Sequence, residues 1–420
     1  MEKSNPLNLA LTRALAPSAQ RVAGGHSSGE GRMKKSISLC LALLGALTLP
    51  AQAADKIKIG FISTLSGPGG VLGAAIRDGF NLALEQTGGK VGGLPAEVII
   101  EDDQQKPDVA RQLADRLIKR DKVDLMTGIV FQNLLQAVEQ PVLQSQTFYV
   151  SPNTGPSDLA GEKCNPYFFA VSWVSDSYSE ATGKNVNDKG YKKVFVIAPN
   201  YPGGVDVVNG FKRYYKGGYA GEIFTKLGQL DYAVELSQLR AAKPDAVFFF
   251  LPGGMGVNFL KQYHQAGLNK EVPLFGTGWS FDQDTLAAVG EPTLGALNAA
   301  HWNLDLDNPQ NRKFVADFEK KYGRLPNEYA SQGYDALMLM DAAVRDVKGR
   351  IEDKDAMRKA LEAANFKSVR GAFKFNRNHF PIQNYYLRQV VKDDKGRFVN
   401  KTVGTIFTDH PDAYVSACKM

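Results

Sequence analysis

The sequence predicts an α/β protein of two lobes, each built on a parallel sheet covered by helices. Alternating strand and helix patterns start at Lys56, and the same alternation starts again at Lys193. Repetition of this kind is typical of parallel sheets with helices on both faces. At 420 residues the chain is also too long for one ordinary core. We therefore expect one Rossmann-like lobe before about residue 172 and another after it.

The expected elements of the first half follow from local patterns. Residues 56–62 alternate polar and apolar side chains as a strand does, and residues 74–86 carry apolar side chains at helical spacing. Pro107 suits the first turn of a helix. The further elements expected here are strands at 98–100, 123–127 and 148–150 and helices at 107–120 and 134–140.

The second half shows the same alternation of strands and helices and then becomes more helical. Its expected strands are 193–198, 223–225, 246–250 and 273–275, separated by helices at 205–215, 234–242 and 257–266. Three further helices are expected at 311–322, 329–346 and 355–364. Strands resume at 372–375 and 385–391, and the polar residues 392–396 predict a hairpin turn.

The N-terminal segment has the pattern of a secretory signal peptide. Lys34 and Lys35 precede an apolar run from Ile37 to Leu49, and an A-x-A cleavage pattern follows at 51–53. The apolar run is shorter than the roughly 20 residues that span a bilayer, which disfavours a retained anchor. We expect residues 33–53 to be the signal peptide and residues 1–32 to be a wrongly assigned extension.

Charge and cysteine content narrow the class of protein. Residues 1–53 contain six basic and two acidic side chains, so their removal lowers the net charge from +6 to +2 and leaves no basic stripe for nucleic acid.

Cys164 and Cys418 remain after export to an oxidising compartment. We expect them to pair, with two unlinked thiols as the alternative, because sequence does not give their separation.

Enzyme classes are disfavoured by the motifs. Glycines at 67–73 follow a strand, but their spacing is not that of a dinucleotide fingerprint, and Pro68 removes an amide from the turn. The five histidines are scattered without metal-ligand spacing, and no nucleophile motif is present. We expect no cofactor, no metal and no catalysis.

Six segments in order resemble one family. They are KIKIGFISTLSGPGG at 56–70, EDDQQKPDVARQLADRLI at 101–118, SPNTGPSDL at 151–159, KKVFVIAPNYPGGVDVVNGFK at 192–212, AAKPDAVFFF at 241–250 and YGRLPNEYASQGYDALMLMDAA at 322–343. Together these segments resemble the branched-chain amino acid type of periplasmic binding protein, the solute receptors of ABC importers. The resemblance extends over essentially all of the mature chain.

The resemblance implies a type I periplasmic binding fold whose two lobes are joined by three hinge crossings. Lobe one would comprise 55–172 and 300–378, and lobe two 173–299 and 379–420. The implied function is capture of a small solute in the periplasm by hinge closure, followed by delivery to an ABC permease in the inner membrane. We expect a monomer. The alternative is a receptor subunit that shares the fold and signals to a membrane kinase.

The resemblance also places ligand-binding loops at the carboxyl ends of strands. On the lobe-one side, relatives offer a Ser and a backbone amide to the ligand carboxylate, and here Gln132 or Asn133 would stand in that place. A second loop supplies Asn153, Thr154 and Gly155, whose amides suit an anion. Leu72 and Phe131 complete the expected set on this side, although Phe131 could equally fill the core.

The lobe-two side departs from the amino-acid-binding pattern. Relatives often have Tyr-Gly where this chain has Gly203-Gly204, and Tyr201 is expected to fill the same space. Gly278 occupies the position at which similar amino acid binders have a Glu that pairs with the ligand ammonium. Either Asp282 reaches in from the side, or the ligand has no amino group. Trp279 offers an aromatic face, unless it only fills the core. The pattern favours an aromatic or other organic carboxylate, with an amino acid as the alternative.

Overall fold

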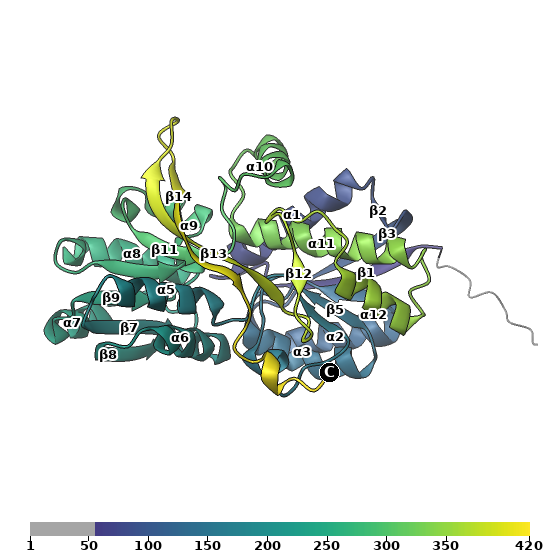
Figure 1. Ribbon diagram of the computed structural model, residues 1–420, viewed down its shortest axis with the longest axis horizontal. Helices are drawn as coiled ribbons and strands as arrows, with labels where there is room; N and C mark the ends of the chain where they lie inside the picture. Colours follow the sequence, from purple (N-terminus) through teal and green to yellow (C-terminus); the bar gives the residue numbers. More distant parts are fainter. Residues whose placement is uncertain (1–54) are drawn as a thin grey trace, which may run out of the picture. The chain divides into compact units, whose positions relative to one another are not determined.

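The computed structural model describes residues 55–420. The expected extension at 1–32 and signal peptide at 33–53 lie outside the described residues. Within the described chain, two sheets form the centres of two lobes (Figure 1). None of the helices in this part of the chain is both long and apolar enough to cross a membrane. The predicted α/β fold class with two lobes is confirmed.

The first lobe contains a six-stranded sheet in the order β2-β3-β1-β4-β5-β6. All neighbouring strands are parallel except β2 and β3, which form an antiparallel edge pair. The strands are β1 (Ile57–Ser63), β2 (Lys90–Val91), β3 (Leu94–Asp102), β4 (Leu125–Thr127), β5 (Phe148–Ser151) and β6 (Phe168–Ala170). Because the strands are parallel, their carboxyl ends meet at one edge of the sheet.

Helices from both halves of the chain cover this sheet. The long helix α11 packs against α1, so a segment far along the sequence returns to the first lobe (Figure 1). The elements are α1 (Gly70–Gln86), α2 (Pro107–Arg116), the π-helical turn η1 (Leu117–Asp121), α3 (Gln132–Gln144), α4 (Ser157–Ala160), α10 (Pro309–Tyr322), α11 (Glu328–Asp346) and α12 (Lys354–Ala363).

The second lobe contains an eight-stranded mixed sheet. Its order is β12-β13-β11-β10-β9-β7-β8, with β14 paired to β13. Strands β7 to β11 pair with one another in parallel. Strand β13 pairs antiparallel with β11, β12 and β14. The strands are β7 (Lys193–Pro199), β8 (Gly218–Thr225), β9 (Ala246–Phe249), β10 (Leu274–Thr277), β11 (Leu297–Ala300), β12 (Lys374–Phe375), β13 (Pro381–Lys392) and β14 (Phe398–His410).

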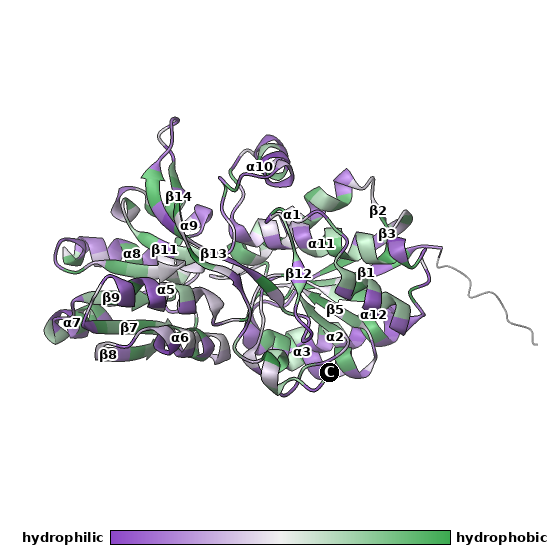
Figure 2. Cartoon of the chain, viewed as in Figure 1, coloured by the Kyte–Doolittle hydropathy of each residue, from purple (hydrophilic) through white to green (hydrophobic). Residues whose placement is uncertain are grey.

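In the sequence, α5 precedes the first strand of the second lobe, and the other helices of this lobe lie between its strands. They are α5 (Ser177–Asp188), α6 (Pro202–Tyr214), α7 (Ala233–Ala242), α8 (Gly254–Gln265) and α9 (Gln283–Val289), with 3-10 turns η2 (Leu268–Lys270), η3 (Gly278–Phe281) and η4 (Glu291–Thr293). Figure 2 shows strand β7 as largely hydrophobic. Six of its seven residues are buried, as expected for a strand covered on both faces.

Most predicted elements lie within a few residues of observed ones, but helices α4, α5 and α9 and strands β2, β6 and β11 were not predicted. Helix α5 reads SYSEATGKNVND and has few large apolar side chains at helical spacing. Its buried face consists instead of small and polar residues. Strands β6 and β11 are only three and four residues long, which is too short to show the alternation of polar and apolar side chains that identifies a strand.

The chain passes between the lobes three times. It leaves the first sheet after β6, at residues 171–176, and returns after β11, at residues 301–308. It crosses again between α12 and β12, at residues 364–373. These three segments connect the elements of the two sheets.

The C-terminal tail adds a further link. After β14 ends in the second lobe, the tail passes to the first lobe, where Cys418 forms a disulfide with Cys164. The Asn378 amide nitrogen donates to the Ala160 carbonyl at 2.7 Å and to the Asp412 carboxylate at 3.0 Å. The tail, which the sequence assigned to lobe two together with β13 and β14, therefore contacts the first lobe.

Removal of the disulfide is expected to lower the free energy of unfolding. The two cysteines are 254 residues apart, so the bond restricts a very large loop of the unfolded chain. The double variant Cys164→Ser/Cys418→Ser should lose about 2–5 kcal/mol, measured by chemical denaturation. A reductant should shift the wild-type transition in the same direction and leave the variant unchanged. Equal midpoints for wild type and variant would contradict this expectation.

Glu139 on α3 predicts a pH-dependent stability. Burial raises the pKa of Glu139 from 4.5 to about 7, and its Oε2 atom has no hydrogen-bond partner among the described residues. A raised pKa means that the stabilising contribution is complete below the unfolded value and is lost as the pH rises through about 7. Glu139→Gln should therefore exceed the wild type in stability at pH 8 by on the order of 1 kcal/mol after solvent screening.

The comparison is made by thermal unfolding at pH 5 and pH 8. The gain should be smaller at pH 5, because the wild-type carboxyl is then largely protonated. The exposed Glu352→Gln serves as the matched control and should show no such difference between the two pH values. A gain at pH 5 that equals the gain at pH 8 would be inconsistent with burial of this carboxyl as the cause.

Candidate ligand-binding cleft

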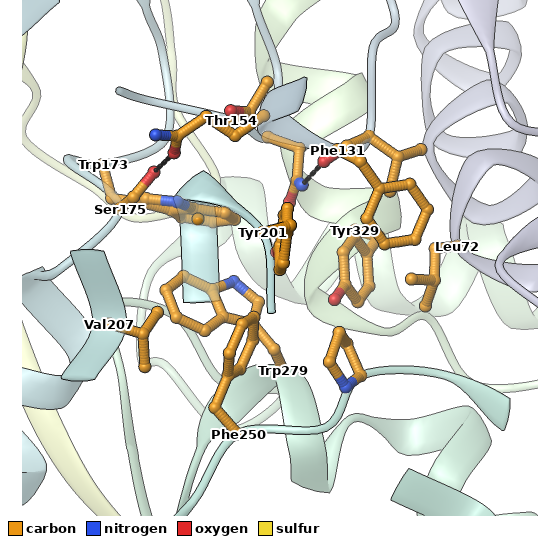
Figure 3. Close-up of a pocket in the computed structure, with 15 residues that line it drawn as sticks. Leu72, Phe131, Thr154, Trp173, Ser175, Tyr201, Val207, Phe250, Trp279 and Tyr329 are labelled. Carbon is orange, nitrogen blue, oxygen red and sulfur yellow. Dashed lines mark hydrogen bonds between the residues drawn. The ribbon is translucent and has the colours of Figure 1, made fainter. Parts of the chain in front are cut away.

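A cavity lies between the two lobes (Figure 3). Its walls are loops that follow the carboxyl ends of β4, β5 and β6 in the first lobe and of β7, β9 and β10 in the second. Open α/β sheets generally bind ligands at this edge. The lining residues are Leu72, Val130, Phe131, Gln132, Asn153, Thr154, Trp173, Ser175, Tyr201, Gly203, Val207, Phe250, Pro252, Trp279 and Tyr329.

Aromatic rings form much of the wall, and Trp279 packs against several other rings. Its ring stacks on Tyr178 of α5 with the ring centroids 4.3 Å apart. Trp173 meets the edge of Trp279 at 5.1 Å, and Phe250 lies at 5.2 Å. These contacts hold the Trp279 indole in one orientation, with one side toward the cavity (Figure 3). Tyr178 therefore packs behind the site.

Two further rings meet across the cleft. Phe131 of the first lobe and Tyr201 of the second lie edge to face with their centroids 6.1 Å apart. Burial raises the pKa of the Tyr201 phenol and also that of Tyr329. Both phenols therefore remain neutral near pH 7 and can donate a hydrogen bond.

The polar part of the cavity carries no formal charge on the lining residues that the structure describes. Three buried polar atoms at this site have no hydrogen-bond partner within residues 55–420, namely Thr154 Oγ1, Trp279 Nε1 and Asn153 Oδ1. Leaving such atoms unpaired in a buried place is costly. The Thr154 hydroxyl and the Trp279 indole N–H are therefore free to donate a hydrogen bond to a bound molecule, and the Asn153 amide oxygen is free to accept one.

Helix α3 begins at the cavity wall. Its N-cap residue, Phe131, makes no capping hydrogen bond with its side chain. The first backbone N–H groups of a helix have no partner within the helix, and the N-terminal end carries a partial positive charge. The start of α3 can therefore receive an anion without any charged side chain.

Gln132 lines the cavity, but its amide is not free for a ligand as the sequence suggested. Its Oε1 atom accepts from Ser175 Oγ at 2.8 Å. Its Nε2 atom donates to the Asp206 carboxylate of the second lobe at 2.9 Å. The side chain therefore bridges the lobes, and only the backbone of this turn remains for an anion.

The structure corrects the interpretation of Asp282. This residue is buried and is the N-cap of α9, where its carboxylate accepts from the Asp284 and Thr285 amides at 2.9 and 3.1 Å. It also accepts from the Thr285 hydroxyl at 2.9 Å. Since these bonds hold it in the second lobe, it does not reach into the cleft to pair with a ligand ammonium.

Gly278 also lies outside the cavity lining, and its surroundings explain why no larger side chain is present. A Cβ atom built on Gly278 would lie 2.6 Å from Glu328 Oε2 and 2.9 Å from Arg388 Nη2. These two buried side chains form an ion pair at 3.3 Å. A Glu side chain at position 278 would therefore collide with Glu328, and Glu328 itself already pairs with Arg388.

Two other predicted residues, Asn133 and Gly155, support the cavity without lining it. Asn133 is the second residue of α3, next to Gln132. A Cβ on Gly155 would lie 1.9 Å from the Trp173 carbonyl oxygen, so only glycine allows this close approach of two loops. Gly155 therefore helps to place Trp173 at the site.

Seven of the predicted residues do line the cavity: Leu72, Phe131, Gln132, Asn153, Thr154, Tyr201 and Trp279. The sequence reasoning missed Val130, Trp173, Ser175, Gly203, Val207, Phe250, Pro252 and Tyr329. Phe250 and Pro252 follow a predicted strand, so their position at its carboxyl end could have identified them. Trp173 and Ser175 follow β6, which was not predicted, and their sequence carries no comparable signal.

No group of side chains that could hold a metal ion occurs among residues 55–420. Two lobes built on parallel sheets, with a cavity at the carboxyl ends of their strands, are typical of periplasmic solute-binding proteins. Comparisons with known proteins agree with this class. The chain matches the model of the periplasmic binding protein family over residues 56–396, and it belongs to this family.

Relatives specify the class further. A Brucella melitensis protein described as Leu/Ile/Val-binding protein homolog 6 is 30% identical over 381 residues, which cover 88% of this chain and 97% of the relative. A solute-binding protein of an ABC transporter from R. palustris, solved in complex with benzoate, is 32% identical with a TM-score of 0.82. That match covers 87% of this chain and all of the other.

A second solved solute-binding protein, from Rhodopseudomonas palustris BisB5, was crystallised in complex with 3,4-dihydroxy benzoic acid. It is 30% identical with a TM-score of 0.79, covering 86% of this chain and 99% of its own. The predicted membership of the branched-chain amino acid type of periplasmic binding protein and the predicted role in periplasmic substrate binding are both confirmed. The role implies a small-molecule ligand and a permease partner.

Tryptophan fluorescence should report on the cleft. The chain has three tryptophans, and Trp173 and Trp279 both line the cavity. Trp302 instead donates its indole N–H to Asn311 at 2.7 Å and does not line the cavity. A bound molecule should therefore change the emission of the wild type and of Trp302→Phe, while Trp279→Phe should lose much of the change. A full signal in a Trp173→Phe/Trp279→Phe double variant would place the ligand elsewhere.

Proposed function

We propose that this protein binds an aromatic monocarboxylate of the benzoate class in the periplasm and delivers it unchanged to the permease of an ABC importer. The observation that carries the proposal is the lining of the cavity, which is aromatic and uncharged and has anion-receiving groups at one end. A small carboxylate with a flat apolar body matches both parts of this lining.

The carboxylate is proposed to lie at the start of α3. There it would accept from backbone N–H groups of the first turn and from the hydroxyl of Thr154, whose Oγ1 is unpaired. Hydrogen bonds to a charged acceptor are stronger than those between neutral groups. A single negative charge would thus be held without an arginine or lysine in the wall.

The aromatic body is proposed to lie among Phe131, Tyr201 and Trp279. These rings come from both lobes, so a bound ring would contact the two halves of the cleft at once. The indole N–H of Trp279 has no partner and could donate to an oxygen substituent on the ligand ring. Closure of the hinge over such a ligand would bury its apolar surface.

An α-amino acid fits this cavity less well. Its ammonium needs a carboxylate close by, since an unpaired buried ammonium costs several kcal/mol. Of the two acidic side chains near the second-lobe loop, Asp282 caps α9 and Glu328 pairs with Arg388. Neither of them lines the cavity.

Relatives give independent support to the proposal. The two solved proteins from R. palustris strains described above were crystallised with benzoate and with 3,4-dihydroxy benzoic acid. A third, also from R. palustris, was crystallised with 4-hydroxybenzoate and is 27% identical with a TM-score of 0.78. We further propose that the chain is exported by residues 33–53, acts as a monomer, and uses its three crossings as the hinge.

A ligand screen of the mature protein tests the proposal. Benzoate, hydroxybenzoates, leucine and dicarboxylates are compared by thermal shift and then by isothermal titration. Benzoate or a hydroxybenzoate should raise the melting temperature with increasing concentration, as mass action requires, and leucine should not. Stabilisation by leucine alone would overturn the proposed ligand class.

Thr154→Val tests the proposed carboxylate site. The substitution keeps the size of the side chain and removes the hydroxyl, so benzoate affinity should fall by about ten-fold or more, the equivalent of one hydrogen bond to a charged group. The control is Thr147→Val, which makes the same change in the first lobe outside the cavity. Equal benzoate affinity of Thr154→Val and the wild type would exclude Thr154 as a carboxylate ligand.

A further inference from the structure

Asp206 joins the second lobe to the first beside the cavity. It lies on α6, in the second turn of the helix, and is 9% exposed. Its carboxylate accepts from Gln132 Nε2 at 2.9 Å, from Ser157 Oγ at 2.9 Å and from the Ser157 amide at 3.3 Å. All three donors belong to the first lobe.

The donors come from the starts of two different helices. Gln132 is the first residue of α3, and Ser157 is the first residue of α4. Gln132 is itself held by Ser175, which lies in the first crossing between the lobes. The Asp206 carboxylate thus completes a chain of hydrogen bonds from the hinge, through the cavity wall, to the second lobe.

A role in folding of the second lobe does not explain these contacts. Within the described chain, the Asp206 carboxylate has no hydrogen-bond donor from the second lobe. Desolvation raises the pKa of Asp206, and the bonds from Gln132 and Ser157 oppose this shift. A buried carboxylate with donors only from the opposite lobe is well bonded when the lobes are together and loses those bonds when they separate.

Other contacts between the lobes differ in kind. The Gly254 amide meets the Pro68 carbonyl only at 3.4 Å. Arg324, in a loop of the first lobe, pairs with Asp78 of α1 at 2.9 Å and with Asp284 of α9 at 3.4 Å. Its side chain is 34% exposed, so solvent weakens this ion pair. The ion pair of Glu328 on α11 with Arg388 on β13 is also buried between the lobes, but neither residue lines the cavity. The Asp206 contact is buried and holds Gln132, a residue of the cavity wall.

We propose that Asp206, together with Gln132 and Ser157, is the latch that holds the cleft closed. Asp206 is a positioning residue, because it acts through the two lobes and is not part of the cavity lining. The latch stabilises the closed state and thereby slows ligand release. This role does not depend on which ligand is bound.

The experiment compares Asp206→Ala with Asp206→Asn, which keeps an oxygen acceptor for Gln132 and Ser157. Asp188→Ala at the exposed end of α5 is the control for loss of a carboxylate. Small-angle X-ray scattering measures the opening of the lobes with and without benzoate, and stopped-flow tryptophan fluorescence measures benzoate dissociation. Circular dichroism and melting temperature verify that each variant is folded.

Asp206→Ala should shift the scattering curves toward a larger radius of gyration and raise the benzoate dissociation rate roughly ten-fold or more, as expected for loss of charged hydrogen bonds. Asp206→Asn should show a smaller change, and Asp188→Ala none. If Asp206→Ala does not fold, Ser157→Ala removes one bond of the same latch from the first lobe and should change both quantities in the same direction.

Scattering and dissociation rates that match the wild type in a folded Asp206→Ala or Ser157→Ala variant would overturn the latch. Absence of benzoate binding in the wild type would instead overturn the proposed ligand class, and the ligand-free scattering comparison would then decide the latch by itself. The failure of one proposal is therefore distinguishable from the failure of the other.

Discussion

The stack of Trp279 on Tyr178 connects the wall of the cavity to the segments that cross between the lobes. Tyr178 lies on α5, directly after the first crossing, and its hydroxyl contacts His301 in the second crossing. Trp173, in the first crossing, packs against the same indole. The wall of the cavity is thus built on the segments that must bend for the lobes to move. A change at this stack would alter the shape of the site and the motion of the hinge together.

The buried ion pair of Glu328 and Arg388 determines the charge around the cleft. Arg388 also donates to Asn298 at 2.8 Å and to the Trp302 carbonyl at 3.0 Å, so it is held in place from several sides. Burial raises the pKa of Glu328 to about 8, and Arg388 is its hydrogen-bond partner, so this carboxyl is not free to pair with a ligand ammonium. The uncharged lining then leaves backbone amides and hydroxyl or indole groups to select the ligand.

Much of the fold could be predicted from the sequence because the central strands are apolar runs of recognisable length. Strands β1 and β7 and helices α10 to α12 were found within a few residues. Helix α5 was not, because its buried face is formed by residues such as Ser179 and Glu180, which propensity places on a surface. Burial of these side chains depends on partners far along the chain, including Arg213 and His410.

The site was predicted less completely than the fold. The loops could be located, because cavity residues follow the carboxyl ends of parallel strands. The roles of single side chains could not, because they depend on contacts between distant segments. Gln132 is held by Asp206 of the other lobe, and Asp282 is held by its own helix. Sequence alone gives the residue type in both cases but not the competing hydrogen bonds.

The bond between Cys164 and Cys418 has a topological consequence. It closes a covalent ring that contains the whole second sheet and all three crossings. A single cleavage of the backbone anywhere inside this ring would leave both fragments attached to each other. After proteolytic cleavage of any one crossing, the two chain fragments would stay covalently joined until the disulfide is reduced.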